Sequence, residues 1–278
     1  MNRSLSSLAR RRSARIAIGA AAAALVVLAL ALSGAAGSHR VPPPPVHPTS
    51  VDQIQNLDQV KTAIYVYYGN STDPSRVSPI DGMPLQTFSD DGPYANEVEG
   101  VVDSAQRYLR KSQALKVPAG TTRSVLFDVD DTTLSTFSYQ TYANFVFNAT
   151  SNAAFANAAI FQAVPHMVEL EHFAESLGYT VFFLTGRNIL QHDGTLTNLT
   201  NEGYDVIDAN LYLKDNTAPW LSSCAPTCAT TQYKSLTRQH IESLGYHIVA
   251  NFGDQFSDLN GGFADKTFKI PNPMYFLP

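Results

Sequence analysis

Two similar junctions mark places where a helical pattern ends and a strand-like run begins directly. They read Glu175-Ser-Leu-Gly178-Tyr-Thr-Val and Glu242-Ser-Leu-Gly245-Tyr-His-Ile, each with a glycine in the position of a helix C-terminus. Helices that alternate with strands in this way are typical of a parallel sheet covered by helices on both faces. Ligands of such sheets bind at the carboxyl ends of the strands. The sequence therefore predicts an α/β fold and makes the residues after each strand the candidates for function.

The most acidic of these strand ends follows the apolar run that begins at Ser124. It contains Asp128, Asp130 and Asp131 within four positions. Packed carboxylates resist ionising together, so the cluster indicates a bound cation or shared protons. Side chains two positions apart in an extended segment share a face, which suits Asp128 as a nucleophile beside Asp130 as an acid/base. The alternatives are an exposed acidic turn or a calcium loop.

Two further strand-like runs end in groups suited to an anion. The run from Tyr179 ends at Thr185 and is followed by Arg187, which either adds charge to a phosphate site or lies on the surface. Lys234 stands at the predicted start of a helix that runs to Leu244. Because the helix dipole disfavours a cation there, a bound anion would explain the lysine. Lys214 also follows a strand and is the rival for that position.

A fourth strand-like run, from His247 to Phe252, is followed by Gly253, Asp254 and Asp258. Hard cations take oxygen ligands, and carboxylates from separate strand ends can converge on one ion. We therefore expect Asp254 to bind metal. Asp258 is expected to orient a bound water or another ligand.

The segment from Leu126 to Tyr139, with its D-x-D-x-T core, resembles the first motif of the haloacid dehalogenase superfamily. Its longer signature is similar to the class B and class C acid phosphatase branch, which includes plant vegetative acid phosphatases. That branch more often has glutamate at position 131. The segment from Phe268 to Phe276 resembles the plant-type end of the branch.

The resemblance implies a Rossmann-like parallel sheet and an Mg²⁺-dependent acid phosphatase that forms an aspartyl phosphate on Asp128. It assigns Asp130 as acid/base, and Thr185 and Lys234 as ligands of the phosphoryl oxygens. Asp128, the backbone carbonyl of Asp130, and Asp254 would hold the metal. The alternatives are a phosphotransferase with the same chemistry, a non-catalytic storage protein, and a surface protein that binds a phosphorylated ligand. Loss of the nucleophile would identify a storage protein, and Asp128 is present.

One domain is predicted from residue 51 to residue 278, with a small helical cap inserted at about 137–164, where aromatic, Asn and Ala residues dominate. Helices are expected at 51–68 and 96–115, and a loop at 69–94. The aromatic residues of the cap segment are expected to form its core: Tyr139, Tyr142, Phe145, Phe147, Phe155 and Phe161.

The first forty residues have the layout of an export signal. Arginines precede an uncharged apolar run from Ile16 to Leu32, and small residues follow it. The run is also long enough for an uncleaved membrane anchor, which is the alternative and the one membrane contact expected. Prolines in 41–50 predict a stiff linker. We expect an exported protein, either secreted, periplasmic or held at the cell surface.

The chain's formal net charge of −5 argues against nucleic acid as a partner. The resemblance implies a small phosphomonoester as the substrate. Cys224 and Cys228 are the only cysteines. Two thiols make a poor zinc site, and export favours oxidation, so we predict a disulfide between them.

Overall fold

The computed structural model describes residues 49–50 and 56–277. The predicted export segment, 1–40, and most of the predicted linker, 41–50, lie outside these residues. From Asn56 onward the chain forms one compact unit. None of the helices in the described ranges has the length and hydrophobicity needed to cross a bilayer.

The centre of the fold is a five-stranded sheet in the order β7-β6-β3-β8-β9, and every neighbouring pair is parallel. Its strands are β3 (Thr122–Phe127), β6 (Thr180–Asn188), β7 (Leu211–Lys214), β8 (Tyr246–Gly253) and β9 (Lys266–Lys269). In the middle strand, Phe127 aligns with Phe183 on one side and with Phe252 on the other. The predicted parallel α/β sheet is confirmed.

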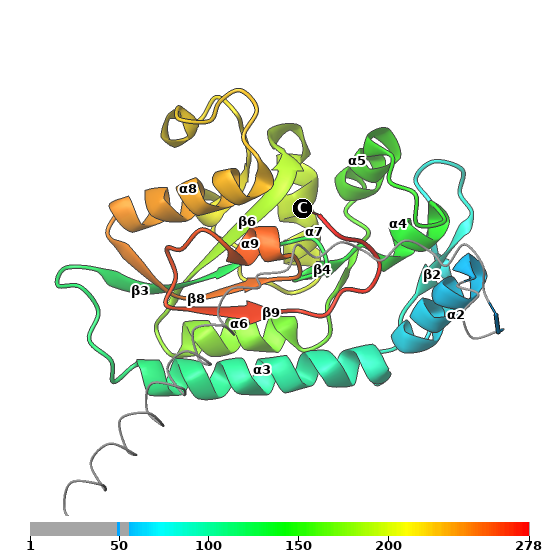
Figure 1. Cartoon of the computed structure of the whole chain (residues 1–278), viewed down its shortest axis with the longest axis horizontal. Helices are drawn as coiled ribbons and strands as arrows, with labels where there is room; N and C mark the ends of the chain where they lie inside the picture. The colour runs from blue at the N-terminus through cyan, green and yellow to red at the C-terminus, as the bar shows by residue number, and fades with distance from the viewer. Residues whose placement is uncertain (1–48, 51–55, 278) are drawn as a thin grey trace, which may run out of the picture. The chain divides into compact units, whose positions relative to one another are not determined.

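Side chains of the middle strand alternate between two cores. Val125 and Phe127 belong to the core shared with α3 (Pro93–Ser112) and α6 (Met167–Ser176), whereas Leu126 belongs to the core shared with α8 (Thr230–Ser243). Successive residues of a strand point to opposite faces of the sheet. Because helices cover both faces here, every residue of Val125 to Phe127 is apolar. Figure 1 shows α8 on one side of the sheet and α3 and α6 on the other.

The starts of two helices depend on local backbone features. Helix α6 begins at Met167, directly after His166, whose backbone is left-handed with φ 63°. The other, α8, begins at Thr230, so Lys234 lies one turn inside the helix and not at its start. Gln232 accepts a hydrogen bond from the Ala229 amide at 3.2 Å, which satisfies one of the free donors at this earlier start.

The expected loop at 69–94 is wrong in part. It contains an antiparallel pair, β1 (Ser71–Val77) and β2 (Pro84–Thr87). The residues of β1 are exposed or half-buried, so the strand lacks the apolar alternation by which a strand is recognised in sequence. Its flanking helices, α2 (Leu57–Tyr68) and α3, are close to the predicted ones.

The segment predicted as a cap contains α4 (Phe137–Tyr142) and α5 (Ala149–Asn157). A short strand, β5 (Gln162–Ala163), closes it by pairing with β4 (Leu134–Ser135). Tyr139, Phe155 and Phe161 are fully buried, as expected of its core, while Phe147 is exposed. The remaining elements are α7 (His192–Asn201), α9 (Phe256–Leu259) and the 3₁₀ turns Ile189–Gln191, Asp208–Asn210 and Pro219–Leu221.

Candidate active site

Asp128 follows β3 at the carboxyl edge of the sheet, and its amide donates to the Phe252 carbonyl at 2.9 Å. The chain then turns sharply. Thr133 closes this turn, because its hydroxyl lies 3.2 Å from the carbonyl oxygens of both Asp128 and Val129. The backbone therefore holds Asp128 at the end of β3, and the turn follows directly after it.

Lys234 is the buried partner of Asp128. Its ammonium group donates to the Asp128 carboxylate, to the Leu184 carbonyl at 2.6 Å, and lies 3.1 Å from Asp258. Burial alone would lower the pKa of Lys234, but Asp128 and Asp258 together raise it above its ordinary value. The lysine is thus a fixed positive charge between two carboxylates.

Three buried carboxylates converge here, although Lys234 is the one cation that pairs with them among the described residues. The oxygens of Asp128, Asp254 and Asp258 lie within 4.8 Å of one another. Burial and the neighbouring carboxylates raise the pKa of Asp128 and of Asp254, and Lys234 opposes this rise at Asp128. A second cation would allow all three to ionise, and an all-oxygen set fits a hard divalent ion.

Asp130 pairs with Arg187, which is 5% exposed and so is not a surface arginine. The Arg187 Nη2 lies 2.8 Å from Oδ1 of Asp130, and Nε lies 3.1 and 3.2 Å from its two oxygens. The fully buried Thr185 donates to the same carboxylate at 3.4 Å and accepts from the Arg187 amide at 3.1 Å. Sequence reasoning left the role of Arg187 open; the structure joins it to Asp130.

Asp131, for which the sequence predicts no chemistry, is fully buried, with φ 56°. It accepts hydrogen bonds from the Thr136 amide and hydroxyl at 2.8 and 2.5 Å, and from the Tyr275 hydroxyl at 2.8 Å. Burial nevertheless raises its pKa to about 6. Asp131 therefore holds the turn after Asp128 together.

The C-terminal segment braces the site from a second direction. Asn272 donates to Asp254 at 2.7 Å, and the Leu277 amide donates to Gln255 at 3.0 Å. Gln255 in turn donates to Asp254 at 2.6 Å. In Figure 1 this red segment leaves β9 and turns back past α9. Sequence reasoning missed Asn272 and Tyr275; the only signal was the plant-type ending.

Arg238 supports Asp258 from within α8. It is fully buried and donates to the carbonyls of Asp258 at 2.6 Å and Gly262 at 2.8 Å. Arg238 lies one turn after Lys234, so both project from one face of the helix. This face anchors the loop that carries Asp258.

The rival lysine, Lys214, lies elsewhere. Its ammonium group donates to the Cys228 carbonyl at 3.1 Å and lies 5.9 Å from the centre of the Tyr233 ring. Among the described residues, Asp128 is contacted by Lys234 and not by Lys214. Cys224 and Cys228 form the predicted disulfide.

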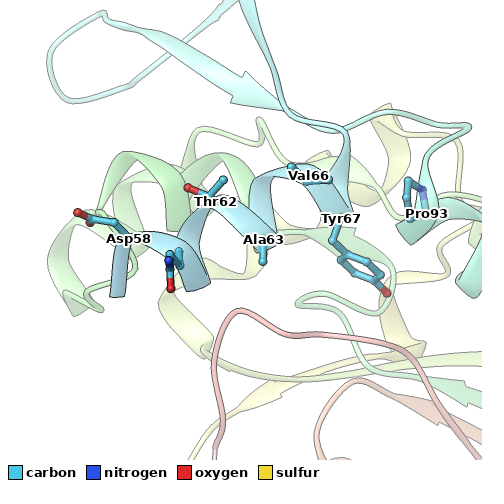
Figure 2. Close-up of a pocket in the computed structure, with 7 residues that line it drawn as sticks. Asp58, Thr62, Ala63, Val66, Tyr67 and Pro93 are labelled. Atoms are coloured by element: carbon cyan, nitrogen blue, oxygen red, sulfur yellow. The ribbon is translucent and has the colours of Figure 1, made fainter. Parts of the chain in front are cut away.

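A separate pocket lies over α2 and contains none of these residues (Figure 2). Its lining is Asp58, Gln59, Thr62, Ala63, Val66, Tyr67 and Pro93. This pocket is therefore separate from the acidic site at the edge of the sheet.

The comparisons with known proteins agree with this geometry. A family model described as HAD superfamily, subfamily IIIB (Acid phosphatase) matches residues 86–278. Acid phosphatase 1 of Solanum lycopersicum is 31% identical over 247 residues, which cover 86% of this chain and 92% of that protein. The Stem 28 kDa glycoprotein of Glycine max is 34% identical over 157 residues, 55% of this chain and 59% of that protein. The match thus spans about three-fifths of the length of the stem glycoprotein.

Solved structures share the fold. The class C acid phosphatase from Bacillus anthracis with tungstate bound superposes with a TM-score of 0.58 at 19% identity, over 80% of this chain and 87% of that one. The fold and the site together define an α/β protein with a buried acidic centre at the carboxyl edge of a parallel sheet. The family match is more specific: the chain belongs to the haloacid dehalogenase (HAD) superfamily, subfamily IIIB, the acid phosphatases.

Proposed function

We propose that this protein is an acid phosphatase that hydrolyses phosphomonoesters through an aspartyl phosphate on Asp128. The observation that carries the proposal is the contact of Lys234 with Asp128 and Asp258 in a buried site. Lys234 offsets the repulsion between a phosphate dianion and the carboxylates, and it orients the Asp128 oxygen. Family membership supports the same reaction.

In the first half of the reaction, an oxygen of Asp128 attacks phosphorus and the bond to the leaving oxygen breaks. Asp130 gives its proton to that oxygen, so the alcohol leaves neutral. Asp130 then takes a proton from water, whose oxygen attacks the phosphorus of the acyl phosphate. Inorganic phosphate leaves and Asp128 is restored. Thr185 and Lys234 hold the phosphoryl oxygens.

The acidic centre would hold Mg²⁺ through Asp128, the backbone carbonyl of Asp130, and Asp254. Asp258 lies in the same cluster, so it is a candidate ligand as well as the orienting group expected from sequence. The ion, when bound, supplies positive charge that neutralises the phosphate and the carboxylates. Arg187 holds the Asp130 carboxyl in place through two of its nitrogens.

The test compares hydrolysis of p-nitrophenyl phosphate by wild type and Asp128→Asn, with Mg²⁺ present. We expect a loss of at least about 10³-fold, because the nucleophile is removed without a change of shape. Asp103→Asn, which alters an exposed carboxylate, is the control and should retain full activity. Acid-quenched wild type should carry one phosphoryl group on the peptide containing Asp128. Wild-type activity in Asp128→Asn would exclude the mechanism.

A storage function is the second candidate, because Vegetative storage protein 2 of Arabidopsis thaliana is 31% identical over 157 residues. Wild type that turns over none of a panel of phosphomonoesters, with and without Mg²⁺, would favour it. If an acceptor alcohol increases release of the leaving group and receives the phosphoryl group, the protein is a phosphotransferase.

We also propose that the protein is exported. The disulfide between Cys224 and Cys228 supports this location, since such bonds persist in oxidising compartments. N-terminal sequencing of protein from the cell fraction where it accumulates tests the proposal. Export predicts a start within or after residues 33–37, or an intact leader in the membrane fraction. Intact protein in the cytosol alone would exclude it.

A further inference from the structure

A second group of possible metal ligands lies between α6 and the segment after α7. Glu171 and His172 are adjacent on α6, and Asp205 follows α7. The ligand atoms of these three side chains lie within 4.8 Å of one another. None of them belongs to the candidate active site.

Three oxygens surround one nitrogen of this group. The His172 Nε2 lies 3.0 Å from the Gly203 carbonyl, 3.5 Å from Glu171 Oε2 and 3.6 Å from Asp205 Oδ2. Only the first is a hydrogen-bond distance. Ligands about 2.1 Å from a tetrahedral zinc ion stand about 3.4 Å apart, so the two longer distances match ligands that share an ion.

Glu171 lacks the partners that a buried carboxylate needs. Its side chain is fully buried, and its contacts with donors in the described part of the chain are weak: the Asp205 amide, and Nε2 of His172 at 3.5 Å. Burial and the nearby Glu175 raise the pKa of Glu171 to about 8, and the Asp205 amide offsets part of this rise. No lysine or arginine of the described residues forms an ion pair with Glu171, Glu175 or Asp205. A buried, unpaired carboxylate is costly unless a cation or proton neutralises it.

Two other histidines lie beside carboxylates and show what an ordinary pairing looks like. His192 faces Asp193 with Nδ1 at 3.1 Å and Asp208 with Nε2 at 2.9 Å. His247 likewise uses opposite nitrogens for its two carboxylates. Carboxylates on opposite sides of a ring cannot share an ion with one nitrogen. His172 differs, because both carboxylates converge on Nε2.

We propose that Glu171, His172 and Asp205 bind a divalent cation of the zinc type, with the Gly203 carbonyl or a water as fourth ligand. One imidazole with two carboxylates suits Zn²⁺ better than Mg²⁺, which prefers oxygen alone. The neutral imidazole of His172 would bind the ion through Nε2 and carry its proton on Nδ1, so the ring loses no net proton. The ion would fasten α6 to the segment that leads to β7. Tyr204 in that segment donates to the Thr133 carbonyl at 2.8 Å, so the site adjoins the turn after β3.

The test is calorimetric titration of the chelator-treated full chain with ZnCl₂, in the presence of saturating Mg²⁺ to occupy the acidic centre. We expect one tight binding event per chain and a higher melting temperature. His172→Gln and Glu171→Gln should each weaken this event at least about 100-fold. His192→Gln is the matched control and should bind as wild type does.

Asp128→Asn separates the two centres. The tight event should persist in Asp128→Asn and disappear in His172→Gln; the reverse pattern would overturn the proposal, as would the absence of any tight event in wild type. His172 is half-exposed, so its substitution leaves the core intact. If Glu171→Gln fails to fold, the binding measured with His172→Gln still tests the proposal.

Discussion

The Arg187 guanidinium donates hydrogen bonds to the Asp130 carboxylate from two nitrogens, Nε and Nη2. The shortest contact is 2.8 Å, from Nη2 to Oδ1. The same guanidinium donates from Nη1 to the Thr195 hydroxyl at 3.0 Å. Since Thr195 lies on α7, the arginine connects the proposed acid/base with the helix that follows β6. A two-point contact of this kind fixes the direction of a carboxylate as well as its charge.

Replacing Arg187 should therefore reduce turnover without removing the nucleophile. We expect Arg187→Ala to lower kcat/KM by about 100-fold, because the acid/base loses its orientation. Arg187→Lys should recover only part of the activity, since an ammonium group cannot make the planar two-point contact. Arg107→Ala, which breaks an exposed ion pair with Asp103, is the control. Wild-type kinetics in Arg187→Ala would show that Asp130 needs no such support.

The hydroxyl of Tyr275 should stabilise the fold through Asp131. Tyr275→Phe removes one donor from a buried carboxylate, and we expect a loss of about 1–3 kcal/mol in the free energy of unfolding. Tyr142→Phe is the matched control, because its hydroxyl bonds Asp81 at 3.0 Å on the exposed surface. There we expect a loss below about 0.5 kcal/mol. Urea unfolding measures both, and equal losses would contradict the predicted role of burial.

The dependence of activity on Mg²⁺ concentration should change when Asp254, or Asn272 that donates a hydrogen bond to it, is replaced. Asp254→Asn removes a proposed ligand charge, so we expect half-maximal activation at a much higher Mg²⁺ concentration. Asn272→Ala leaves the carboxylate but removes its 2.7 Å donor. We expect a smaller shift there, of about tenfold. An Mg²⁺ titration unchanged in both variants would exclude Asp254 as a ligand.

Trp220, the only tryptophan of the chain, should report the protonation of His240. The two rings stack with centroids 3.9 Å apart. Burial lowers the pKa of His240 below its ordinary value of 6.5. The unfolded chain therefore binds this proton more readily, and the stability that neutral His240 contributes is complete above pH 6.5 and lost as pH falls through the lowered pKa.

An imidazolium quenches indole fluorescence more strongly than a neutral ring, so emission should fall on acidification with a midpoint below 6.5, the ordinary value. His240→Gln should abolish this step. A midpoint above 6.5 would show that the stacking favours the charged ring over the neutral one.

The strands that carry the site could be predicted because each is an uninterrupted apolar run. Strands β3, β6 and β8 lie between two helical layers. Because both of their faces are buried, each appears in the sequence as a run of consecutive apolar residues. The hairpin of β1 and β2 is exposed and has no such signal. The helix start at Met167 was also hidden, because it depends on the left-handed backbone of His166.

The sequence alone was sufficient for the parallel sheet, for the order of the acidic and hydroxyl groups at its carboxyl edge, and for the disulfide between Cys224 and Cys228. These depend on residue type and on spacing along a few neighbouring positions. Only the tertiary structure decided which charges meet. Arg187 reaches Asp130 across 57 positions, and Tyr275 reaches Asp131 across 144. Such contacts depend on strand order and on the path of the C-terminal segment, which bring together groups that no local pattern connects.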